Sequence, residues 1–271
     1  PGLTLKRLFS GEFGEEGFGP ARWLEGKGLA TLERAASGGG HDLVSYDPAS
    51  GERSVLISAR SLTPKGESRP LQVSNYEFSG DGGKLLVFTN TRRVWRYHTR
   101  GDYWVLDRKS GVLQRLGRTL DSTWLQFAKF NSDATKVAYV HRSDIYVEDL
   151  ASRAITRLTS DGSATRINGT FDWVYEEEWG LRDGFRWSPD GKSIAFWQMD
   201  ASGVGEFSLV DNTSSLYPKV TPIRYPKVGT TNPSARVGIV ASTGGDIRWM
   251  DVPGDSRDNY IARMEWAANS D

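Results

Sequence analysis

Short runs of apolar residues recur along the chain, and each follows a turn that contains an aspartate. The repeat is clearest in residues 78–88, 130–140 and 187–197, which read FSGDGGKLLVF, FNSDATKVAYV and WSPDGKSIAFW. Each segment begins with an aromatic residue, and its uninterrupted apolar run is typical of an inner strand covered on both faces. The aspartate suits the turn because its carboxylate accepts hydrogen bonds from nearby backbone N–H groups. The pattern therefore predicts one β-hairpin used three times.

A second strand–turn–strand pattern follows these hairpins. Residues 102–107 and 112–116, which read DYWVLD and VLQRL, are separated by a turn that contains Ser-Gly. Residues 144–149 and 155–158 repeat the pattern, and an earlier copy begins at residue 42. Four antiparallel strands in a unit of roughly 40–60 residues are typical of one blade of a β-propeller. We therefore predict an all-β chain with the propeller fold, and a β-sandwich is the alternative interpretation.

An aromatic residue marks the start of every unit. These positions are Trp23, Phe78, Phe130, Trp187 and Trp266. They give about four four-stranded antiparallel blades, followed by the stub of a fifth. Because a propeller removes its strand edges by closing a ring, an interrupted ring leaves edges open. We therefore expect residues 1–271 to be a partial propeller domain of a longer polypeptide.

One stretch, residues 169–180, interrupts the repeat and reads GTFDWVYEEEWG. Asp172 is suited to cap the N-terminus of a short helix, and the helix dipole favours the acidic residues that follow it. A helical turn separates the side chains of Glu177 and Glu178 by about 100°, so both can point toward one small cation. The large aromatic neighbours would hold these carboxylates against a partly desolvated wall. A solvated acidic helix face is the alternative.

Composition argues against several partners and chemistries. The 34 basic and 34 acidic residues cancel, so the chain has no net charge to attract nucleic acid or an anionic membrane. It contains no cysteine, so neither a disulfide nor a thiol nucleophile is expected. Its three histidines lie far apart in the sequence, whereas a zinc site needs clustered ligands. We therefore expect no metal and no cofactor.

Residues 172–178, which read DWVYEEE, resemble the glutamate motif of the dipeptidyl peptidase IV family, in the prolyl oligopeptidase superfamily. The resemblance implies that Glu177 and Glu178 bind the free α-ammonium group of a peptide substrate. Glu176 lies beside them and is a third candidate for substrate binding.

Two further segments resemble the same family, in the same order along the chain. Residues 94–98, which read VWRYH, resemble the segment with the family's substrate-carbonyl arginine, which falls on Arg96. Residues 217–219 and 225–233 resemble the stretch that follows the glutamates. The likeness covers nearly the whole chain and is weaker before about residue 70.

The resemblance implies a domain that gates and recognises substrate in a serine-type dipeptidyl peptidase, which releases N-terminal dipeptides of the Xaa-Pro or Xaa-Ala type. The family's catalytic triad belongs to a C-terminal α/β-hydrolase domain, which we expect to be absent from this chain. No Gly-x-Ser-x-Gly sequence occurs here. We therefore expect no catalytic residue in residues 1–271 and no activity of these residues alone.

The resemblance also implies partners and a location. The expected partners are a peptide with a free N-terminus, the hydrolase domain, and a second copy of the chain bound through an arm at residues 203–233. The expected location is extracytoplasmic, either periplasmic or secreted. Two alternatives remain open: a non-catalytic propeller that binds proteins, and a periplasmic propeller of the translocation-associated type, which shares hairpins such as that at Trp187.

Overall fold

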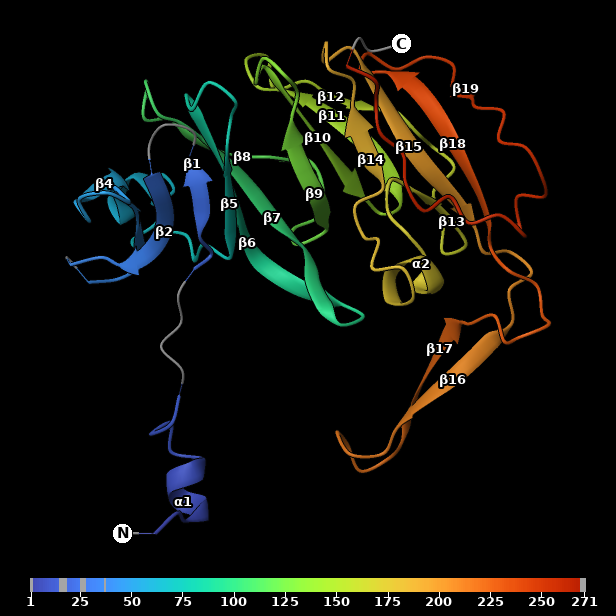
Figure 1. Ribbon diagram of the computed structural model, residues 1–271, viewed down its shortest axis with the longest axis horizontal. Coiled ribbons are helices and arrows are strands. Elements are labelled where there is room, and N and C mark those ends of the chain that lie inside the picture. Colours follow the sequence, from blue (N-terminus) through green and yellow to red (C-terminus); the bar gives the residue numbers. More distant parts are fainter. Residues whose placement is uncertain (1, 15–18, 25–27, 37, 269–271) are drawn as a thin grey trace. The chain divides into compact units, whose positions relative to one another are not determined.

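The regular secondary structure of the described residues is almost entirely β and forms several antiparallel sheets (Figure 1). The structure is a computed structural model that describes residues 2–14, 19–24, 28–36 and 38–268. The chain divides into two compact units, Pro1–Tyr76 and Glu77–Asp271, which are described separately.

The first unit is built around a four-stranded antiparallel sheet. Helix α1 (Leu5–Leu8) precedes the sheet, and a 3₁₀ turn, η1 (Ala59–Leu62), follows it. The strands lie in the order β1 (Arg22–Leu24), β2 (Gly28–Arg34), β3 (His41–Tyr46) and β4 (Arg53–Ile57). Near the end of the unit the Tyr76 hydroxyl donates to the Ala30 carbonyl at 2.9 Å. The strand–turn–strand copy predicted from residue 42 is confirmed as β3 and β4.

The second unit contains an eight-stranded sheet, whose first strand begins two residues before the unit does. In chain order its strands are β5 (Asn75–Phe78), β6 (Lys84–Val94), β7 (Tyr97–Asp107), β8 (Leu113–Arg115), β9 (Leu125–Phe130), β10 (Lys136–His141), β11 (Asp144–Asp149) and β12 (Ile155–Arg157). They are hydrogen-bonded in the order β12-β11-β10-β9-β7-β6-β5, and β8 pairs with β7. Arg100 lies opposite Gln126 and Gly101 opposite Leu125. Two four-stranded blades are therefore joined by the pairing of β7 with β9.

A five-stranded sheet follows in the order β13 (Arg166–Asn168), β15 (Ser193–Asp200), β18 (Ser234–Ala241) and β19 (Arg248–Trp249), with β14 (Phe185–Trp187) also paired to β15. Strand β13 pairs with residues 198–200 and β14 with residues 194–196, so the two short strands occupy successive parts of one edge of β15. Helix α2 (Trp173–Glu177) lies in the loop between them. The predicted insertion is therefore a loop between two short strands that pair with the same edge of β15.

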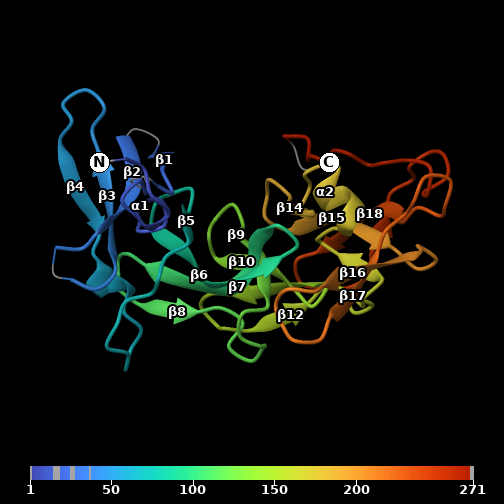
Figure 2. The ribbon, with the colours of Figure 1, turned by 90° about the horizontal axis from the view of Figure 1, so that it is seen from below.

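A separate hairpin, β16 (Glu206–Asp211) paired with β17 (Lys219–Arg224), leaves the second unit between β15 and β18. It stands apart from the sheets of this unit in Figure 1. Figure 2 follows the sheets in chain order, from β6–β12 in green to β15 and β18 in orange and red.

The three predicted aspartate turns are present. The backbone N–H of Gly83 donates to Asp81, that of Thr135 to Asp133 and that of Lys192 to Asp190, at 2.9, 2.9 and 3.0 Å. These bonds close the β5–β6, β9–β10 and β14–β15 hairpins.

Strand β10 has buried side chains on both faces, as its uninterrupted apolar run predicts. Val137 and Tyr139 belong to a cluster with side chains of β6, β7 and β9. Ala138 and Val140 belong to another with side chains of β11, β14 and β15. Because successive side chains of a strand point to opposite faces, β10 joins the two cores. Trp266, the start of the predicted stub, lies in irregular chain and donates its indole N–H to the Arg186 carbonyl at 3.1 Å.

Candidate functional site

Helix α2 forms where the sequence predicts it. Asp172 is the N-cap, and its carboxylate accepts a hydrogen bond from the Tyr175 N–H at 3.2 Å. Burial raises the pKa of the Asp172 carboxyl to about 6. The Tyr175 ring stacks on Phe171, and its hydroxyl accepts from the Ile261 N–H at 3.0 Å. The packing of its buried face therefore fixes the position of the helix. The same packing sets the direction in which the side chains of its last residues point.

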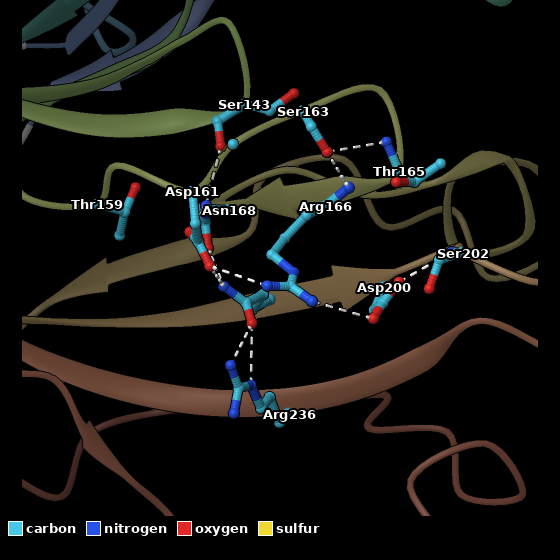
Figure 3. A network of polar contacts seen from close by, with 12 residues as sticks. Ser143, Thr159, Asp161, Ser163, Thr165, Arg166, Asn168, Asp200, Ser202 and Arg236 are labelled. Carbon is cyan, nitrogen blue, oxygen red and sulfur yellow. Dashed lines mark hydrogen bonds and ion pairs between the residues drawn. The ribbon is translucent and has the colours of Figure 1, made fainter.

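A network of polar side chains holds the strand that leads into α2 (Figure 3). The amide of Asn168, at the end of β13, is fully buried and donates toward the Ser143 carbonyl at 3.1 Å and the carboxylates of Asp144 and Asp161 at 3.1 and 3.0 Å. The Gln198 amide donates to the Asn168 side-chain oxygen at 2.7 Å. Asn168 therefore links β11, β13 and β15 at the start of the loop that carries α2.

The Gln198 oxygen extends the network to β18. It accepts from Nε and Nη2 of Arg236 at 2.9 and 2.6 Å. The Arg236 guanidinium also lies 3.5 Å from the centre of the Trp249 ring. Each buried polar side chain in this chain of contacts therefore has a hydrogen-bond partner, as buried polar groups generally require.

Arg96 lies in the two-residue turn between β6 and β7, and Figure 1 shows this long hairpin reaching toward α2. The preceding residue, Trp95, has a φ of 48°, the left-handed conformation that such tight turns require. The Arg96 guanidinium forms an ion pair with the Glu177 carboxylate. Its side chain is 73% exposed, whereas that of Glu177 is 8% exposed. The structure thus brings together two of the residues predicted to bind substrate.

Glu177 keeps one carboxylate oxygen without a hydrogen-bond partner. Its Oε2 atom pairs with Arg96, but Oε1 is buried and unpaired among the described residues. Glu178, at the C-cap of α2, is exposed and borders the same cavity. The two carboxylates and the guanidinium therefore present charge and hydrogen-bonding capacity to one space.

That space is a cavity of about 940 Å³. Its walls combine aromatic side chains, Trp95, Trp173, Phe207 and Tyr225 among them, with charged ones, which are Arg93, Arg96, Glu177, Glu178 and Lys227. Phe207 comes from β16, and Tyr225 follows β17, so the separate hairpin contributes to the cavity wall. An apolar wall lowers the local dielectric constant and strengthens the attraction between the carboxylates and a cation.

Glu176 is oriented differently from its two neighbours. It is 6% exposed and is not among the residues that line the cavity. Its Oε1 atom lies 3.8 Å from Nε of Arg182. Burial raises the pKa of the Glu176 carboxyl to about 7, Arg182 opposes this increase and Glu177 adds to it. Glu176 therefore contacts the loop that follows α2.

Sequence reasoning missed Arg182 and the cavity walls contributed by β16 and β17. Arg182 lies only four residues beyond Glu178, but no repeat or motif distinguishes it. Among the described residues, no group of three or more histidine, aspartate or glutamate side chains is arranged to hold a metal ion. No described helix has the length and hydropathy needed to span a membrane.

Comparison with known proteins places this chain in a family. The model of the dipeptidyl peptidase IV (DPP IV) N-terminal region matches residues 79–271. Dipeptidyl aminopeptidase B of Saccharomyces cerevisiae is 32% identical over 223 residues, which are 80% of this chain and 26% of that protein. Human prolyl endopeptidase FAP is 28% identical over 274 residues, which are 98% of this chain and 34% of that protein.

A solved structure agrees with the sequence comparisons. The crystal structure of Porphyromonas gingivalis dipeptidyl peptidase 4 superposes with a TM-score of 0.85 at 27% identity, covering 100% of this chain and 38% of that one. The chain thus spans roughly a quarter to two fifths of the length of the relatives it matches. The all-β propeller fold and the family resemblance predicted from the sequence are both confirmed. This chain belongs to the family of the dipeptidyl peptidase IV N-terminal region.

Proposed function

We propose that this chain recognises the N-terminus of peptide substrates in a serine-type dipeptidyl peptidase, with Glu177 and Glu178 binding the substrate's α-ammonium group. The observation that carries the proposal is the buried, unpaired Oε1 atom of Glu177, a residue that lines the cavity. A buried carboxylate oxygen without a partner is costly, and a bound cation offsets that cost. A peptide ammonium carries a positive charge and three donors, so it can contact both carboxylates.

Arg96 has a second part in this proposal. In the free site its guanidinium occupies the Oε2 side of Glu177. When the ammonium binds Oε1 and reaches across to Oε2 as well, the exposed Arg96 side chain is released to donate hydrogen bonds to a substrate carbonyl. Two fixed points, the ammonium and the carbonyl, then set the direction and reach of the peptide. Only the second peptide bond would reach a nucleophile at a fixed distance, which is catalysis by positioning.

The experiment compares Glu177→Gln and Glu178→Gln with wild type in the full-length protein, using a chromogenic dipeptide substrate with a free amine. We expect kcat/KM to fall at least about 30-fold in Glu177→Gln, because breaking a buried charge pair costs about 2–5 kcal/mol. The fall in Glu178→Gln should be smaller because its carboxylate is exposed. Glu52→Gln, which changes an exposed glutamate of the first unit, serves as the control and should behave as wild type.

A second substrate tests the ammonium itself. Acetylation removes the positive charge and two donors from the peptide's N-terminus, so wild type should cleave the acetylated substrate as poorly as the variants cleave the free one. Equal cleavage of the two substrates by wild type, or unchanged kcat/KM in both glutamine variants, would contradict the proposal.

We further propose that a second copy of the chain binds the β16–β17 hairpin. A two-stranded hairpin is marginally stable alone, and this one exposes apolar side chains. Val210 and Val220 lie opposite each other in the hairpin and are 54% and 59% exposed. Leu216 and Tyr217, in the connecting turn, are 90% and 79% exposed. A symmetric partner covers such a surface with the same apolar side chains.

A further inference from the structure

Arg182 connects the two elements that carry the proposed substrate-binding residues. Its guanidinium lies 3.6 Å from the centre of the Tyr97 ring, which is a close cation–π stack. Tyr97 is the first residue of β7 and directly follows Arg96. On its other side, Arg182 lies 3.8 Å from the buried Glu176 carboxylate of α2. One side chain thus bridges the β6–β7 turn and the helix.

The backbone around Arg182 is itself held firmly. The Leu181 N–H donates to the Tyr175 carbonyl at 2.9 Å. Asp183 forms an ion pair with Lys129 of β9, whose ammonium group also donates to the Phe185 carbonyl at 2.7 Å. The backbone at Arg182 is therefore held in place. The stacking of its guanidinium on Tyr97 can then restrain the turn between β6 and β7.

The restraint matters because, in the proposed function, the other contact between the turn and α2 is lost when substrate binds. Among the described residues, the Arg96–Glu177 ion pair and the Arg182–Tyr97 stack link the turn to the segment around α2. In the proposed function, the substrate's ammonium displaces Arg96 from Glu177. The first link is then lost, and the second persists.

We infer that Arg182 is a positioning residue: by stacking on Tyr97 and pairing with Glu176, it keeps the turn that carries Arg96 at a fixed distance from Glu177 and Glu178 while substrate is bound. The inference rests on the proposed function for its consequence in catalysis. The mechanical link between the turn and α2 is independent of that function and can be measured separately.

Hydrogen–deuterium exchange of residues 92–98 in the full-length protein measures the link directly. We expect Arg182→Ala to accelerate exchange in this peptide about fivefold, because the turn loses a contact that persists in the folded protein. Arg118→Ala, which removes another exposed arginine of the same unit, is the matched control and should leave the peptide unchanged. Unchanged exchange in Arg182→Ala would overturn the inference.

Kinetics then test whether the link acts through Arg96. We expect Arg182→Ala to lower kcat/KM for a free-amine dipeptide substrate about tenfold. Tyr97→Leu should do the same, whereas Tyr97→Phe should retain activity because the stack needs only the ring. Arg182→Lys should remain impaired because an ammonium group lacks the planar face of a guanidinium.

A double-mutant cycle separates positioning from general damage. In an Arg96→Ala background, Arg182→Ala should change kcat/KM less than twofold, because the group that it positions is gone. A further tenfold loss in that background would overturn the inference. If wild type releases no dipeptide but Arg182→Ala still accelerates exchange in residues 92–98, the proposed function fails and the link stands.

Discussion

The buried Glu176 carboxyl should make the stability of this domain depend on pH. Its pKa in the folded chain is about 7, above the ordinary 4.5, and burial is the largest cause. The unfolded chain therefore loses this proton at a lower pH than the folded chain does. The contribution of the protonated Glu176 carboxyl to the stability of the fold is therefore complete below about pH 4.5 and is lost as the pH rises through about 7.

Glu176→Gln isolates this effect because glutamine has the shape of the protonated acid. The interval between pKa 4.5 and about 7 corresponds to about 3 kcal/mol at ~1.4 kcal/mol per pKa unit. Because Arg182 nearby is partly exposed and solvent screens part of the interaction, we expect roughly half of this, about 1–2 kcal/mol. The variant should match wild type at pH 4.5 and exceed its stability by that amount at pH 8.

Differential scanning calorimetry of the full-length protein provides the assay. For a domain of about 200 residues, 1–2 kcal/mol corresponds to a Tm increase of about 3–6 °C at pH 8. Glu178→Gln removes one negative charge from the same helix end at an exposed position and controls for net charge. A Tm difference between Glu176→Gln and wild type that is the same at pH 4.5 and pH 8 would refute the reasoning.

Two further predictions concern the insertion and the hairpin. A Cβ at Gly169, where φ is 74°, would lie 2.8 Å from Cγ1 of Ile145, so Gly169→Ala should destabilise the domain by about 3 kcal/mol. Gly180→Ala, at a φ of 69° with open space around it, should cost only about 1 kcal/mol in the same calorimetric comparison. Val210→Glu combined with Val220→Glu should convert a dimer to a monomer in sedimentation velocity without changing the cavity-lining residues, and a wild-type monomer at micromolar concentration would contradict the proposed partner.

The features that the sequence predicted correctly depend on local chemistry. The aspartate turns form because each carboxylate accepts hydrogen bonds from its own turn, and Asp172 caps the N-terminus of α2 in the same way. The uninterrupted apolar run of β10 predicts that both faces of the strand are buried, and this pattern can be recognised within the strand itself. Such features require only a window of about ten residues.

The features that the sequence could not predict depend on contacts between distant residues. The pairing of Gly101 with Leu125, which joins two blades in one sheet, is a matter of register between separate hairpins. Glu176 and Glu177 are adjacent in the motif, yet one contacts Arg182 and the other borders the cavity. This difference between the two side chains follows from the packing of α2. Phe207, which lines the cavity, belongs to a hairpin that lies outside the sequence repeat.

The burial of Asn168 has a consequence for how the protein can be produced. Residues 168–170 read Asn-Gly-Thr, an acceptor sequence for N-linked glycosylation, and residues 212–214 read Asn-Thr-Ser, another. Asn212 is exposed and leaves room for a sugar chain, whereas the Asn168 amide is fully buried and committed to hydrogen bonds. In a eukaryotic secretory host, a sugar attached to Asn168 before folding would prevent β13 from joining its sheet. Production in a bacterial host avoids this competition between glycosylation and folding.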